Sequence, residues 1–154
     1  MAFPSPSVDI RAAPVDFDEL VDWLERWSYR LVLLEEYELH DIRTAVESVE
    51  RAVHAHRARF DPWVRAIGPK DEPTSRAVRV VLSDHEWFEI SLEQLVWFLQ
   101  VVEQEDHGGH RQALGQFGRV LAEALRRHRR DEAWLEGTTA RGGTARSPSP
   151  GNPN

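Results

Sequence analysis

The chain has 154 residues, which suffices for one ordinary domain and is too few for two well-packed ones. Hydrophobic residues make up 41% and charged residues 29%, a globular composition that excludes a wholly disordered chain. The lack of cysteine excludes disulfides, a thiol nucleophile and cysteine-ligated metal centres. A net charge of −7 argues against generic binding to nucleic acid or to anionic membranes.

Both ends of the chain have the composition of tails. Residues 1–14 contain three prolines, and residues 137–154 combine four glycines with three prolines and few apolar side chains. Such segments cannot bury enough surface to offset the entropy lost on ordering. We therefore expect disordered tails at 1–14 and 137–154 around a single helical domain at 15–136. We find no secretory signal and no apolar run long enough to span a membrane, so we expect a cytoplasmic location without membrane contact.

The first half of the domain has helical periodicity. No glycine or proline occurs from Val15 to Asp61, and Asp16 with Glu19 has the spacing of a capping box. One apolar series runs from Leu20 to Leu34, and a second, out of phase by one residue, continues through His56. A single helix over 16–66 would be about 75 Å long. That length exceeds a compact domain, so a turn near 37–41 is favoured over one re-phased helix.

The second half is also predicted to be helical. Gly68-Pro69 ends the preceding helix, and a loop is expected at 69–75. Residues 76–82 fit either a strand or a helix face, and helix is favoured because a lone strand would have no partner. Serines with capping-box spacing then predict helices at 84–90 and 92–106. After Gly108-Gly109, a last helix is predicted from 110 to 135, and Gly137 terminates it. His128 is the last member of the apolar series of this helix.

These elements predict an all-α protein, a compact bundle of four or five helices with short loops. The predicted core is Trp23, Leu24, Trp27, Leu31, Leu34, Val46, Val49, Val53, Phe60, Leu95, Phe98, Leu99, Val102, Leu114, Phe117, Leu121 and Leu125.

Helix bundles can hold metal ions through glutamate and histidine side chains one turn apart. Glu50 with His54, and Glu103 with His107, have this spacing. If the two pairs faced each other, they could ligate a divalent metal. The same spacing is also ordinary for exposed acid–histidine pairs. We therefore expect no cofactor and keep this metal site as an alternative.

Two segments resemble the small helical ribonucleases of the HEPN superfamily, which carry an arginine and a histidine separated by four to six residues. Arg51 with His56, and Arg79 with His85, have related spacings. The resemblance implies metal-independent RNA cleavage, in which the histidine handles a proton and the arginine holds the phosphate. Ala52 stands where the family usually has a polar residue, and His56 falls on the apolar series of its helix.

The sharpest charge feature is the basic run at 126–130, in a chain that is acidic up to its last helix. Arg126, Arg127, Arg129 and Arg130 would complement the C-terminal end of a helix dipole or pair with acidic helices. They would alternatively contact an acidic partner or nucleic-acid phosphates.

Adjacent aromatic residues at Trp87-Phe88 and Trp97-Phe98 point to partly different helix faces, and a small bundle cannot bury all of them. Trp87, Phe88 and Trp97 are therefore predicted, with the four arginines, to form a partner surface.

The leading hypothesis is a non-catalytic cytoplasmic interaction or regulatory protein that docks a protein partner or a second copy. A metal-binding or hydrolytic bundle is the alternative. Nucleic-acid binding through the last helix is the third hypothesis.

Overall fold

The computed structural model describes residues 12–33, 38–67 and 72–146, and these residues form four helices and no strand. In chain order the helices are α1 (Phe17–Leu33), α2 (Leu39–Ile67), α3 (Glu72–Gln104) and α4 (Gly108–Arg146). The prediction of an all-α bundle is confirmed. The outer parts of the predicted tails, 1–11 and 147–154, lie outside the described residues. None of the helices described is both long enough and apolar enough to cross a membrane.

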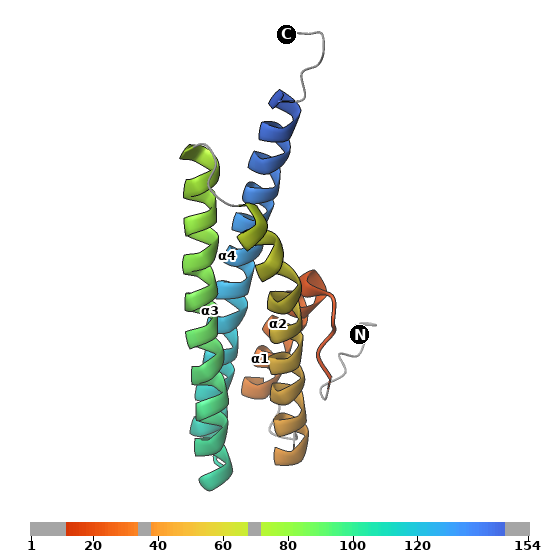
Figure 1. Cartoon of the computed structure of the whole chain (residues 1–154). Helices are drawn as coiled ribbons and strands as arrows, with labels where there is room; N and C mark the ends of the chain where they lie inside the picture. Colours follow the sequence, from red (N-terminus) through yellow and green to blue (C-terminus); the bar gives the residue numbers. More distant parts are fainter. Residues whose placement is uncertain (1–11, 34–37, 68–71, 147–154) are drawn as a thin grey trace.

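Consecutive helices run in opposite directions, as Figure 1 shows. α4 packs closely along α1 and α3, and α2 touches the same two helices less extensively. The backbones of α2 and α4 do not approach each other, so these two helices lie diagonally across the bundle. This up-and-down arrangement is the one that short connections favour.

Local signals set the helix ends. The Asp16 carboxylate accepts the backbone N–H groups of Asp18 at 2.8 Å and Glu19 at 3.2 Å, which confirms the predicted cap before α1. Between α3 and α4, Arg111 donates two hydrogen bonds to Asp106, at 2.7 and 2.8 Å. This arginine lowers the pKa of Asp106 and fixes the tight turn.

The core consists of two apolar clusters. The larger joins α1 to the other three helices, and the smaller contains Phe60, Val64, Ile67, Ala77, Val81 and Leu135. The smaller cluster lies beyond α1, which is much shorter than α3 and α4. The predicted core residues are buried, apart from Phe98 and Phe117, which are partly buried, and Leu34, which lies outside the described residues.

The structure corrects the predicted helices of the second half. Residues 76–82 are helical, and they belong to one continuous helix that starts at Glu72, inside the predicted loop, and replaces the separate helices at 84–90 and 92–106. Ser91 does not cap a helix, because its hydroxyl donates to the carbonyl of Trp87 one turn earlier at 3.1 Å. In the first half, α1 ends at Leu33 and α2 starts at Leu39, so the prediction of two helices is confirmed, but residues 39–41 of the predicted turn already belong to α2 and 34–37 lie outside the described residues.

α4 also extends past its predicted end at Gly137 and reaches Arg146. Leu135 is fully buried in the smaller cluster, Thr138 is buried, and the Thr139 hydroxyl donates to the Leu135 carbonyl at 2.8 Å. These interactions outweigh the cost of one glycine in a helix, which is about 1 kcal/mol. Residues 137–140 are therefore packed helix and not a tail.

Gly118 sets the close approach of α1 and α4. A Cβ atom at this position would lie 2.2 Å from the Ser28 hydroxyl oxygen, which is fully buried. Gly118→Ala should therefore destabilise the protein by about 1–3 kcal/mol in urea unfolding, despite the better helix propensity of alanine. Adding Ser28→Ala should recover part of this loss. Gly108→Ala, where no atom lies within 4 Å, is the control and should be neutral or stabilising.

Candidate functional site

A cluster of histidines and carboxylates occupies the interior of the bundle where the two apolar clusters meet. His56 comes from α2, His85 from α3, and His128 and Glu132 from α4. His85, His128 and Glu132 are at most 2% exposed. His56 and His128 point inward because they occupy apolar positions in the periodic series of their helices.

Glu132 joins histidines from opposite corners of the bundle. Its Oε2 atom lies 2.6 Å from Nε2 of His56 and 3.0 Å from Nε2 of His128. The ligand atoms of these three residues all lie within 4.8 Å of one another. Glu132 Oε1 lies 3.4 Å from an Arg129 nitrogen, so one oxygen faces the imidazoles and the other faces a guanidinium.

Aromatic rings enclose the three residues. Phe17 of α1 stacks on His56 with ring centroids 3.9 Å apart. Phe60 and Phe88 contact the His128 ring edge-on, at 5.7 and 4.9 Å. These apolar walls limit access of water and restrict the orientation of both imidazoles.

His85 extends the cluster towards α2. Its ring lies 4.8 Å from that of His128, and its Nδ1 atom lies 3.1 Å from Asp61 Oδ1. The second oxygen of Asp61 accepts a hydrogen bond from Arg57 at 3.0 Å, and Arg57 also donates to Glu89 of α3. Polar side chains therefore lie next to one another from the interior to the surface between α2 and α3, although neither nitrogen of His85 has a hydrogen-bond partner among the residues that the structure describes.

Two pKa shifts fix the charges of the cluster. Burial alone would raise the pKa of Glu132, but the imidazoles of His128 and His56 outweigh it and lower that pKa to about 2. Burial, reinforced by the neighbouring His128, lowers the pKa of His85 to about 4. At neutral pH the site thus holds an ionised carboxylate and a neutral His85 imidazole.

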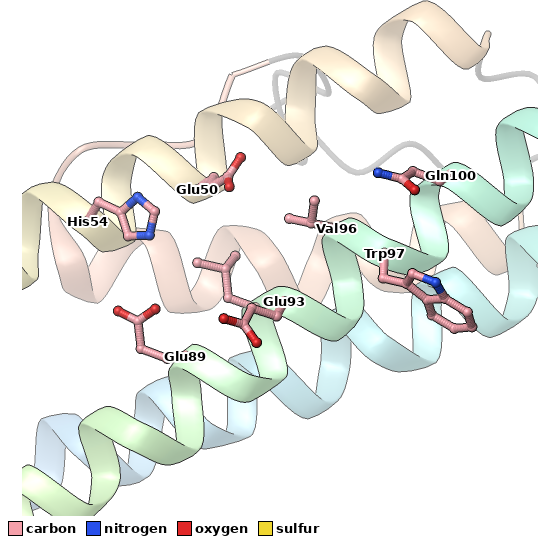
Figure 2. Close-up of a pocket in the computed structure, with 8 residues that line it drawn as sticks. Glu50, His54, Glu89, Glu93, Val96, Trp97 and Gln100 are labelled. Atoms are coloured by element: carbon pink, nitrogen blue, oxygen red, sulfur yellow. The ribbon is translucent and has the colours of Figure 1, made fainter.

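The metal residues predicted from the sequence do not converge. Glu50 and His54 line a pocket of about 280 Å³ between α2 and α3, together with Glu89, Glu93 and Trp97 (Figure 2). Glu103 instead forms an ion pair with Arg43 at 2.5 Å. Arg43 lies about 10 Å along α2 from Glu50, so Glu103 is next to a different part of α2 than the predicted metal site.

His107, the fourth predicted ligand, lies at the start of α4 near Glu105 and His110. The rings of His107 and His110 are tilted by 31° with centroids 3.8 Å apart, and the Nδ1 atoms of both are engaged with the backbone, that of His107 by the His110 N–H at 3.3 Å and that of His110 by the Glu105 carbonyl oxygen at 2.6 Å. This exposed group is a poorer metal site than the buried one.

The predicted partner surface is only partly exposed. Trp87 and Trp97 are more than half exposed, but Phe88 is fully buried against His128 and His85 and cannot bind a partner. The prediction that Phe88 belongs to a partner surface is thus wrong, because Phe88 lies on the side of α3 that faces the bundle axis.

Two of the four predicted arginines are engaged within the protein. Arg126 contacts Glu25 at 3.0 Å and Arg129 contacts Asp18 at 3.0 Å, both on α1. Arg127 and Arg130 are exposed. This arrangement fits pairing with acidic helices better than a continuous phosphate-binding patch.

The arginine–histidine pairs of the ribonuclease resemblance are split between surface and core. Arg51 is exposed while His56 is directed inward, and Arg79 contacts Glu72 at the surface while His85 is buried. In each pair the two side chains therefore face different environments.

Sequence reasoning identified His56 and His128 as members of apolar series but missed that they meet. One local signal was available, since His128 and Glu132 are four residues apart on one helix face. The partner His56 is 76 residues away from Glu132, and only the bundle topology brings it there.

The chain matches no known protein-family model, no curated protein and no solved structure. The function is therefore inferred from the geometry of the site.

A second buried carboxyl group provides a test of the charges in the core. Burial and the neighbouring Asp131 raise the pKa of Asp84 from 3.8 to about 7. The folded state then holds a proton that the unfolded state has lost, so this group reduces stability as the pH rises from about 4 to 7.

Asp84→Asn should therefore stabilise the protein at pH 8 by about 1–3 kcal/mol, since one pKa unit corresponds to about 1.4 kcal/mol. The gain should shrink towards pH 4 in thermal unfolding monitored by circular dichroism. Asp22→Asn, on the exposed face of α1, is the control. An equal effect of Asp84→Asn at both pH values would contradict the assignment.

Proposed function

We propose that this protein binds a divalent transition-metal ion through His56, His128 and Glu132. The observation that carries the proposal is the convergence of two imidazole nitrogens and one carboxylate oxygen, from α2 and α4, inside a shell of aromatic rings. The sequence predicted metal binding as an alternative function, but at Glu50, His54, Glu103 and His107, and the site proposed here uses different residues.

The chemistry of the donors supports a transition metal. Imidazole and carboxylate together suit zinc, iron, nickel and copper, whereas calcium and magnesium take oxygen ligands. Glu132, whose pKa the two imidazoles lower to about 2, is ionised over the whole physiological range, and His56 and His128 would each have to offer an unprotonated Nε2 atom to the ion.

The spacing of the donors is compatible with binding after a small adjustment. Metal bonds of about 2.1 Å in a tetrahedral site place neighbouring ligand atoms about 3.3 Å apart. The contacts of 2.6 and 3.0 Å would therefore open by about half an ångström. Binding would therefore require small rotations of the His56 and Glu132 side chains against the surrounding rings.

The surroundings supply part of what a metal site requires. Arg129 contacts the second oxygen of Glu132 and would hold the carboxylate in place. A bound ion would link α2 to α4, whose backbones do not touch, and would act as a Lewis acid at any coordination position that the protein leaves open.

Metal titration tests the proposal directly. We expect the protein to bind about one equivalent of Zn²⁺ by calorimetry, and Co²⁺ with visible absorption bands typical of nitrogen and oxygen ligands. Glu132→Gln and His128→Gln should each weaken binding by at least about 100-fold. His54→Gln, an exposed histidine of the same helix as His56, is the matched control and should change affinity by less than about threefold.

Either of two results would refute the proposal. One is a failure of the folded wild-type protein to bind any of Zn²⁺, Co²⁺, Ni²⁺ or Fe²⁺. The other is binding that survives in Glu132→Gln and is lost in His54→Gln.

Metal binding should also stabilise the fold. At a free ion concentration 100-fold above the Kd, the gain is about 2.7 kcal/mol. For a chain of this size it should raise the Tm by about 5–10 °C, measured by scanning calorimetry with Zn²⁺ and with a chelator. The same comparison in Glu132→Gln should show no shift; an equal shift there would place the ion elsewhere.

A further inference from the structure

Three large apolar side chains form an exposed row on α3, on a face separate from the buried cluster. Trp87, Ile90 and Trp97 are 51%, 47% and 59% exposed. Their spacing of three and seven residues places them on one side of the helix. Together they leave about 300 Å² of apolar surface open, as much as the largest patch on a typical monomer.

The pocket between α2 and α3 borders this row. Figure 2 shows Glu50 and His54 on α2 opposite Glu89 and Glu93 on α3, with Trp97 at the edge and its ring turned away from α2. Trp97 belongs to both features, so the apolar row and the pocket adjoin at this residue and form one surface.

This surface is acidic. Three carboxylates, those of Glu50, Glu89 and Glu93, line the pocket, and no described lysine or arginine lines it. Arg57 contacts Glu89, but neither Glu50 nor Glu93 forms an ion pair within the described ranges of the chain. The pocket therefore holds two uncompensated carboxylates next to exposed aromatic rings.

We propose that the α2–α3 surface docks a basic amphipathic helix of another protein. Its apolar side chains cover Trp87, Ile90 and Trp97, and an arginine or lysine enters the pocket between Glu50 and Glu93. Trp87 and Trp97 lie about 15 Å apart along α3, a distance that three turns of a partner helix span. The negative charges of Glu50 and Glu93 favour a partner helix with positively charged side chains.

A second copy of the chain fits this surface less well. Pairing two copies through α3 would bring the two acidic faces together, and like charges across an interface oppose association. Arg126 and Arg129 are already engaged with α1, and the exposed Arg127 and Arg130 belong to α4, not to the α3 faces that such a pairing would join.

A synthetic peptide tests the proposal. The probe is a helix of about 18 residues with leucine at i, i+3, i+4 and i+7 spacing and arginine elsewhere; its analogue carries neutral citrulline in place of each arginine. We expect the arginine peptide to bind with a Kd below about 100 μM, by fluorescence anisotropy, and the citrulline analogue to bind at least about tenfold more weakly.

Matched variants locate the binding site. Glu50→Gln with Glu93→Gln should weaken binding about tenfold, whereas Glu19→Gln with Glu105→Gln, an equal charge change at exposed positions away from the pocket, should change it less than twofold. Trp97→Ala should weaken binding about tenfold and Trp134→Ala, the exposed tryptophan of α4, less than twofold. Far-ultraviolet circular dichroism confirms that each variant is folded.

Three outcomes would overturn the proposal. They are absence of binding to the wild-type protein, equal loss in the two double glutamine variants, and a dimer in sedimentation that dissociates on Trp97→Ala and does not bind the peptide. The last outcome would assign the surface to a second copy. The metal titration uses different residues, so failure of one proposal does not decide the other.

Discussion

A carboxylate inside a protein must find compensating charge or hydrogen bonds, because its transfer from water costs several kcal/mol. Glu132 meets this requirement with two imidazoles on one oxygen and a guanidinium at the other. The aromatic rings of Phe17, Phe60 and Phe88 then exclude water from around the imidazoles. Such a polar group is expensive to maintain in a bundle core, and this cost motivates the search for a function there.

The same cluster explains how α2 is held in the bundle. α1 and α4 approach so closely that Gly118 has no room for a side chain, whereas α2 makes fewer close approaches to its neighbours and none to α4. The contacts of His56 with Glu132 and of Asp61 with His85 tie α2 to the other helices through side chains. Arg57, one residue beyond His56, joins this interior network to Glu89 in the surface pocket. The candidate metal site and the candidate docking surface thus share α2, which contributes His56 to the first and Glu50 to the second.

Helical periodicity was sufficient to predict the fold class, the break before α2 and about half of the buried apolar residues, because burial of one helix face is a local property of the sequence. It failed where tertiary packing overrides local signals. Ser91 has the spacing of a cap yet lies in mid-helix, and Gly137 lies within α4 because Leu135 and Thr138 are packed. The site was missed for a related reason: Glu50 with His54 has the same local pattern as His128 with Glu132. Only the position of each pair relative to the bundle axis separates a surface pair from a buried one, and that position is set by all four helices together.

The most direct test of the central claim is a crystal structure of the Zn²⁺-loaded protein with anomalous data on both sides of the zinc absorption edge. The account predicts one strong anomalous peak between Nε2 of His56, Nε2 of His128 and a carboxylate oxygen of Glu132. A loaded crystal with zinc at Glu105, His107 and His110 or in the pocket at Glu50, and none at Glu132, would contradict it.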